Sequence, residues 1–128
     1  MPLNSIPPKT STAALDQKKQ AAQGKCATDV GFWGGAIPGN VAELRPLWEA
    51  GVFGFKCFLV HSGVDEFPPL DPDEMEADMA ILKAFDSLMI VHAADARAIA
   101  RAPPPEAAHY ARFLAYRPPR SATVPGGP

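Results

Sequence analysis

The sequence predicts an α/β fold in which short parallel strands alternate with helices. Three runs have the length and composition of strands: residues 26–33, 52–60 and 88–92. Stretches with helical composition or helical spacing of apolar residues separate these runs. The two later runs are almost entirely apolar, which is typical of strands covered on both faces of a parallel sheet. Alternating strands and helices build right-handed βαβ units over one sheet.

The first two helices are predicted from the residues at their ends. Ser11 can cap a helix rich in alanine, glutamine and lysine, which ends at Gly24. A second helix can begin with a capping box, because Glu43 lies three residues after Asn40. Pro46 favours a restart of this helix, since proline is best tolerated in a first turn.

The third helix has the clearest start of all. Asp71 stands at the N-cap, Pro72 at the first helical position and Glu74 three residues after the cap. Helical spacing predicts that its inner face consists of Met75, Met79, Leu82 and Phe85. Residues 93–102 and 106–116 are also predicted to be helical.

Composition excludes several broad classes of protein. The chain has 128 residues, 47% of them apolar and 20% charged, which is ordinary for one small domain. A net charge of −2 with scattered basic residues favours neither a nucleic acid nor a membrane as partner. No apolar run reaches the roughly 18 residues of a membrane helix. Cys26 and Cys57 lack disulfide-framework spacing, so we expect reduced thiols in a cytoplasmic protein.

Lys56 is the residue whose position most needs a chemical explanation. It lies in the middle of an apolar strand, where an ammonium group loses its hydration unless it is paired or neutralised. Burial also favours the neutral, nucleophilic amine. The amine could form an ion pair, act as a Schiff-base nucleophile, or react with carbon dioxide to give a carbamate that bridges two metal ions. The plainer alternative is an edge strand from which Lys56 reaches solvent.

His92 stands at the carboxyl end of the next apolar strand. Ligands gather at this edge of parallel sheets, and an imidazole there suits a divalent metal, although a single histidine can also be structural. Because their strands follow one another, Lys56 and His92 should lie near each other. Strand parity directs Ser62, rather than His61, to the side of Lys56, so Ser62 is the candidate pocket residue. Cys57 alternates away and is expected in the core.

Four segments together carry a family resemblance. They are MPLNSIPP at 1–8, DVGFWGG at 29–35, GVFGFKCF at 51–58 followed by HSGVDEFP at 61–68, and IVHA at 90–93. These segments resemble allantoinases, which belong to a group of cyclic amidohydrolases that also contains dihydropyrimidinases and dihydroorotases. The resemblance covers roughly residues 1–117, and its most specific part is the stretch from Lys56 to Pro68.

The resemblance implies a fold, a metal centre and a reaction. Members are (β/α)8 barrels with two divalent ions, usually zinc, so this chain would form about three β/α units of a TIM barrel of the metal-dependent amidohydrolase type. The lysine matching Lys56 is carboxylated and bridges both ions, and the histidine matching His92 binds one of them. Such enzymes hydrolyse the ring amide of allantoin, a small-molecule substrate, to allantoate. Full-length relatives are expected to be homo-oligomers.

Parts of the family pattern are missing from this chain. It has no His-x-His pair and no match to the catalytic aspartate, and Ala94 stands where the family has a glutamate. We therefore expect an interior segment with no catalytic residue retained and too few ligands for activity by itself. Residues 1–117 would belong to the barrel domain, and 118–128 would form a disordered tail. The alternatives are an amidohydrolase of the dihydropyrimidinase or hydantoinase type, and a non-catalytic α/β fragment.

Overall fold

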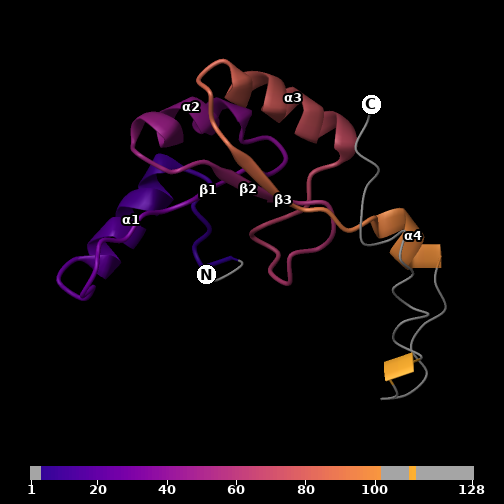
Figure 1. The fold of residues 1–128 in the computed structure, drawn as a ribbon, viewed down its shortest axis with the longest axis horizontal. Coiled ribbons are helices and arrows are strands. Elements are labelled where there is room, and N and C mark those ends of the chain that lie inside the picture. Colours follow the sequence, from indigo (N-terminus) through magenta and orange to yellow (C-terminus); the bar gives the residue numbers. More distant parts are fainter. Residues whose placement is uncertain (1–3, 102–109, 112–128) are drawn as a thin grey trace.

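A parallel three-stranded sheet forms the centre of the computed structural model, which describes residues 4–101 and 110–111 (Figure 1). The strands follow the order β1-β2-β3 and are β1 (Gly34–Gly35), β2 (Phe55–Phe58) and β3 (Met89–His92). The helices of the described residues are α1 (Thr12–Ala22), α2 (Val41–Glu49), α3 (Pro72–Lys83) and α4 (Ala96–Arg101). The predicted α/β class with parallel strands is therefore confirmed.

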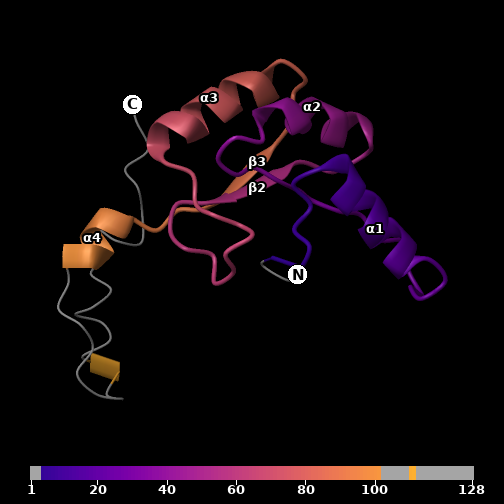
Figure 2. The same cartoon turned by 180° about the vertical axis from the view of Figure 1, so that it is seen from behind.

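Helices α2 and α3 lie side by side on one face of the sheet, as both ribbon views show (Figures 1 and 2). Phe55 and Cys57 of β2 point to this face, because alternate residues of a strand share one side. There they join a core to which the helices contribute leucines: Leu15 from α1, Leu44 and Leu47 from α2, and Leu82 from α3. Burial of these apolar side chains holds one face of β2 against the helices, so the remaining residues of the strand lie on the other face.

The burial expected on both faces of the strands is found for β2 and not for β3. Lys56 and Phe58 alternate to the face opposite α2 and α3, where Phe58 is buried and Lys56 is half-buried. On that side lie the loop after β2 and the N-terminal segment, and Lys18 of α1 also reaches it (Figures 1 and 2). Strand β3 is the most exposed of the three, and its last two residues are open to solvent.

The first strand is not where the apolar pattern predicts it. Residues 26–33 form no strand, and β1 consists of the two glycines that the sequence assigns to a loop. The N–H of Gly34 donates to the carbonyl of Gly54, and the N–H of Ala36 donates to that of Lys56, both at 2.9 Å. A Cβ at Gly34 would lie 2.7 Å from the ring of Phe55. Strand pairing here needs small residues, because neighbouring aromatic rings fill the space.

The predicted helix starts have different outcomes. The hydroxyl of Ser11 accepts from the N–H of Ala14 and caps α1, as predicted. The capping box of α3 is also confirmed, with Asp71 and Glu74 bonding each other's backbone N–H groups. Helix α2 has no capping box, and it continues through Pro46 instead of restarting there.

Asn40 does not cap α2 because its side chain binds other parts of the chain. Its Oδ1 accepts from the N–H of Ile37, while its Nδ2 donates to the carbonyls of Thr10 and Gly35. This buried amide joins β1 to the segment that precedes α1.

The inner face of α3 differs from the prediction at one position. Met79 is 50% exposed, whereas Asp78 is 5% exposed and faces inward. Helix α4 lies within the predicted stretch 93–102. The helix predicted over 106–116 lies outside the described residues apart from Tyr110 and Ala111, and the tail 118–128 lies wholly outside them. No helix in the described ranges is long and apolar enough to cross a membrane.

Candidate metal site and adjoining cavity

Lys56 and His92 both contact the ring of Phe58. The Nζ of Lys56 lies 4.5 Å from the centroid of this ring, and the imidazole of His92 stacks on it with centroids 5.4 Å apart. Phe58 is directly opposite His92 in the parallel pairing of β2 and β3, so the two side chains share one face of the sheet. The structure therefore brings together the two residues that the sequence proposes as metal ligands.

The central position of β2 removes one of the alternatives for Lys56. Its strand lies between β1 and β3, so the edge-strand alternative is wrong. In the described part of the chain the ion pairs are Arg45 with Glu49 and His61 with Asp65, so Lys56 has no carboxylate partner there. The amine instead rests against an aromatic ring on the face that α2 and α3 leave open.

The two donors fit a metal centre in type and placement, but they do not complete one. The imidazole of His92 and the amine of Lys56, if it were carboxylated, lie on one face of neighbouring strands and are suitable ligands for divalent ions. Within residues 4–101 and 110–111, no group of three or more histidine, cysteine, aspartate or glutamate side chains could hold a metal. Further ligands would have to come from elsewhere.

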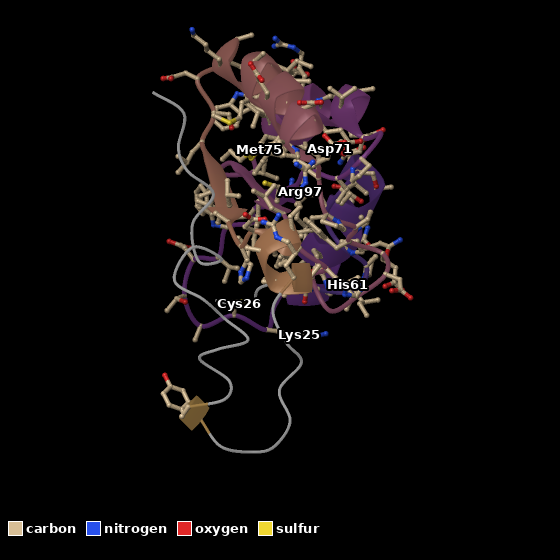
Figure 3. All side chains as sticks on the ribbon, turned by 90° about the vertical axis from the view of Figure 1, so that its right-hand side faces the viewer. Lys25, Cys26, His61, Asp71, Met75 and Arg97 are labelled. Atoms are coloured by element: carbon tan, nitrogen blue, oxygen red, sulfur yellow. The ribbon has the colours of Figure 1, made fainter. Side chains whose placement is uncertain are left out.

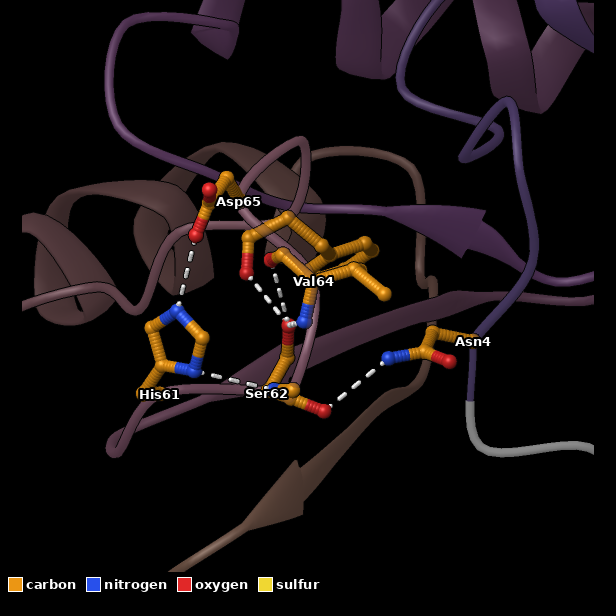
Figure 4. Close-up of polar contacts among 7 residues, drawn as sticks. Asn4, His61, Ser62, Val64 and Asp65 are labelled. Atoms are coloured by element: carbon orange, nitrogen blue, oxygen red, sulfur yellow. Dashed lines mark hydrogen bonds and ion pairs between the residues drawn. The ribbon is translucent and has the colours of Figure 1, made fainter.

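Ser62 and His61 organise the loop that follows β2 (Figure 4). The hydroxyl of Ser62 donates to the carbonyl of Phe67 at 2.8 Å or of Val64 at 3.0 Å. Nδ1 of His61 accepts from a backbone N–H, which leaves Nε2 to donate to Asp65 at 3.2 Å. The contacts of the Ser62 hydroxyl thus lie within its own loop, and substrate contact by Ser62 stays a prediction.

A cavity of about 410 Å³ adjoins Lys56 on the open face of the sheet. Its walls combine aromatic side chains with cationic ones, and they comprise Phe32, Trp33, Phe53 and Phe67 together with Lys9, Lys18 and Lys56. Sequence reasoning missed Lys9 and Lys18, because they precede the sheet in sequence and only the fold brings them to the strand of Lys56. No local spacing could have found them.

The two cysteines are free thiols in different environments. Burial raises the pKa of the Cys57 thiol to about 11, against a small lowering by Lys56, so this cysteine is an unreactive part of the core as predicted. Cys26 lies on the exposed loop after α1, well away from Met75 of α3 (Figure 3).

Comparisons with known proteins identify where this sequence belongs. The chain is 53% identical over 118 residues to the allantoinase of Streptomyces avermitilis and 45% identical over 120 residues to that of Saccharomyces cerevisiae. Each match covers 92% of this chain. The chain belongs to the allantoinase family. It spans 26% of the length of each of these two relatives.

A solved structure extends the likeness to the wider group of cyclic amidohydrolases. An L-hydantoinase (dihydropyrimidinase) from Arthrobacter aurescens superposes with a TM-score of 0.69 at 33% identity, over 74% of this chain and 21% of that one. No protein-family model matches the chain. The resemblance to allantoinases that the four segments predict is thus confirmed.

Proposed function

We propose that this chain supplies part of the active site of a cyclic amidohydrolase, which hydrolyses the ring amide of allantoin to allantoate in purine catabolism. The observation that carries the proposal is the placement of Lys56 and His92 against one ring on the open face of a parallel sheet. Similarity to allantoinases over most of the chain supports the same reaction.

The proposed architecture is a (β/α)8 barrel in which β1, β2 and β3 are three of the eight strands. In such barrels helices cover the outside, functional side chains gather at the carboxyl ends of the strands, and barrel strands have no free edge. Helices on one face and candidate ligands on the other fit this arrangement. Leu88 and Val91, 58% and 36% exposed beside and on β3, fit a sheet that continues past this strand. Residues 1–117 would belong to the barrel domain.

Lys56, as a carbamate, and His92 would hold two divalent ions, with zinc the expected metal. A bound metal pair would polarise the ring carbonyl and lower the pKa of water. Carboxylation would form an N–C bond between the Lys56 amine and carbon dioxide; starting from the ammonium form it releases two protons and converts a cation into an anionic ligand. Phe58 would hold both side chains in place through its ring contacts.

Ser62 would contact the substrate from the loop that follows β2. Its hydroxyl would exchange the hydrogen bond to the Phe67 carbonyl for one to the substrate. Proton transfer would depend on a residue outside this chain, since the sequence retains no match to the family aspartate. A cytoplasmic location is supported by the two free thiols, and we expect the whole enzyme to assemble as a homo-oligomer.

A chimera tests the proposed roles of Lys56 and His92. In it, this chain replaces the matching stretch of the Streptomyces avermitilis allantoinase, with which it shares 53% identity. We expect bound metal and allantoate formation, both reduced about a hundredfold or more by Lys56→Ala or His92→Ala. The control Lys25→Ala changes an exposed lysine that does not line the cavity beside Lys56 and should leave both measurements unaltered. Full metal content in Lys56→Ala would contradict the proposal.

The purified 128-residue chain provides the complementary measurement. With two of the ligands, it should bind no metal pair and form no allantoate. Two bound ions and steady turnover would overturn this expectation. Comparing turnover of allantoin and dihydrouracil by the chimera tests the hydantoinase alternative, which the structural likeness to L-hydantoinase favours as the second candidate.

A further inference from the structure

The cavity beside Lys56 has features that neither metal binding nor strand pairing uses. Aromatic rings form much of its wall, and two further lysines, Lys9 and Lys18, reach it from before and within α1. None of the residues that the structure describes at this wall is acidic. Lys9 and Lys18 therefore bring positive charge to an apolar surface whose other described residues, apart from a carboxylated Lys56, carry no negative charge.

Both ammonium groups form hydrogen bonds with the N-terminal segment at the wall. Nζ of Lys9 donates to the hydroxyl of Ser5 at 3.3 Å, and Nζ of Lys18 donates to the carbonyl of Ile6 at 3.1 Å. Each ammonium has three N–H groups, so each keeps donors for a ligand. Burial lowers the pKa of Lys9, and the charge of Lys18 lowers it further, as expected for two cations that share a partly desolvated space.

The segment that carries these contacts is itself fixed to the sheet and to the loop after β2. The N–H of Gly35 donates to the carbonyl of Lys9 at 2.8 Å, which binds this segment to β1. The amide of Asn4 donates to the carbonyl of Ser62 at 3.0 Å (Figure 4). The cations are thus positioned before any ligand arrives, which reduces the entropic cost of binding.

We propose that this cavity binds the carboxylate of a small organic acid, with Lys9 and Lys18 as its cationic partners. The inference rests on the proposed function for the identity of the acid, which is allantoate, the ring-opened product. Hydrolysis of the ring amide of allantoin consumes one water, breaks the ring C–N bond and gives a carboxylate, a proton and a terminal ureido group in place of an uncharged ring. Cations beside the site therefore discriminate product from substrate, and the aromatic walls offer flat surfaces to the ureido groups.

Trp33 offers a direct readout of binding, because it lines the cavity. The chain has two tryptophans, and the other, Trp48, packs against Phe85, so Trp48→Phe leaves one reporter. In metal-free, low-salt buffer, allantoate should change Trp33 fluorescence saturably, with a Kd at least tenfold lower than that of uncharged allantoin. Lys9→Met and Lys18→Met should each raise the Kd for allantoate about tenfold. Lys25→Met, away from the cavity wall, should not.

Equal binding of allantoate and allantoin by the full chain would overturn the inference, and this comparison needs no lysine variant to fold. Unchanged affinity in Lys9→Met and Lys18→Met would also overturn it. If the chimera turns over allantoin but Trp33 fluorescence shows no preference for allantoate over allantoin, only this inference fails. If binding depends on charge but the chimera is inactive, the proposed function fails and the cavity is still a site for an organic acid.

Discussion

Asp78 is a carboxyl group enclosed by the core, and its chemistry sets how stability depends on pH. It faces inward from α3, and its Oδ2 has no hydrogen-bond partner in the part of the chain that the structure describes. Burial, with an additional contribution from the charge of Glu74, raises the pKa of Asp78 to about 6. The folded chain therefore binds the Asp78 proton more tightly than the unfolded chain does.

The sign of the pH effect follows from this difference. The unfolded carboxyl has its ordinary pKa of 3.8, so stability is greatest below that pH and falls as the pH rises to about 6. Asp78→Asn removes the charge at similar shape. It should raise the free energy of unfolding by about 2 kcal/mol at pH 7.5 and change it little at pH 3.5.

Thermal unfolding followed by circular dichroism at both pH values measures the effect. Asp73→Asn, an exposed carboxylate in the first turn of the same helix, serves as the matched control and should show no such pH dependence. An Asp78→Asn variant that gains nothing at pH 7.5 would show that the carboxylate is solvated or paired.

This residue also shows a limit of helical periodicity. Positions 78 and 79 both fit the spacing set by Met75 and Leu82, and hydrophobicity favours Met79 for the inner face. The actual orientation of α3 depends on how it packs against α2. This packing cannot be deduced from the spacing of apolar residues in α3 alone. Asn40 is a similar case, since its three hydrogen bonds reach segments distant along the chain.

At the scale of elements, the close approach of backbone to neighbouring groups decides where strands can form. A Cβ at Gly54 would lie 2.5 Å from the carbonyl oxygen of Leu88 and 2.8 Å from the ring of Trp33. Gly54→Ala should therefore separate the start of β2 from β3 and cost roughly 2–4 kcal/mol of stability. Chemical denaturation of the two proteins gives this difference.

Gly24 is the natural comparison for Gly54. Its φ is +70°, yet nothing lies within 4 Å of a Cβ built there. Gly24→Ala should cost about 1 kcal/mol, which is backbone strain alone. If Gly54→Ala and Gly24→Ala lower the free energy of unfolding by the same amount, crowding at Gly54 adds nothing to the cost of its substitution.

Elements with local signals were predictable, and elements with distant partners were not. Helices α1 and α3 begin where capping side chains bond their own first turns. Strand β1 escaped prediction because its two glycines pair with β2 and are packed by rings from elsewhere, whereas the apolar run before it forms no strand. Strands β2 and β3 were found from apolar runs; the expected burial on both faces is correct for β2 and wrong for β3.

For the whole molecule, the order of the strands predicts that the candidate ligands lie near each other, whereas their surroundings could not be predicted. Pairing of β2 with β3 puts Lys56 and His92 on one face of the sheet. The ring of Phe58 against both, and the lysines across the cavity, depend on packing between segments far apart in sequence. Their joint position on an open face is the basis of the proposed metal site.

The most direct test of that site is detection of the carbamate. The chimera is assembled with zinc in ¹³C-labelled bicarbonate and examined by ¹³C NMR, alongside its Lys56→Arg variant. We expect one carbamate carbon per active site, and we expect both the carbamate and turnover to be lost in the variant. An active chimera that shows no carbamate, or a carbamate signal that survives Lys56→Arg, would show that Lys56 does not carry the bridging group.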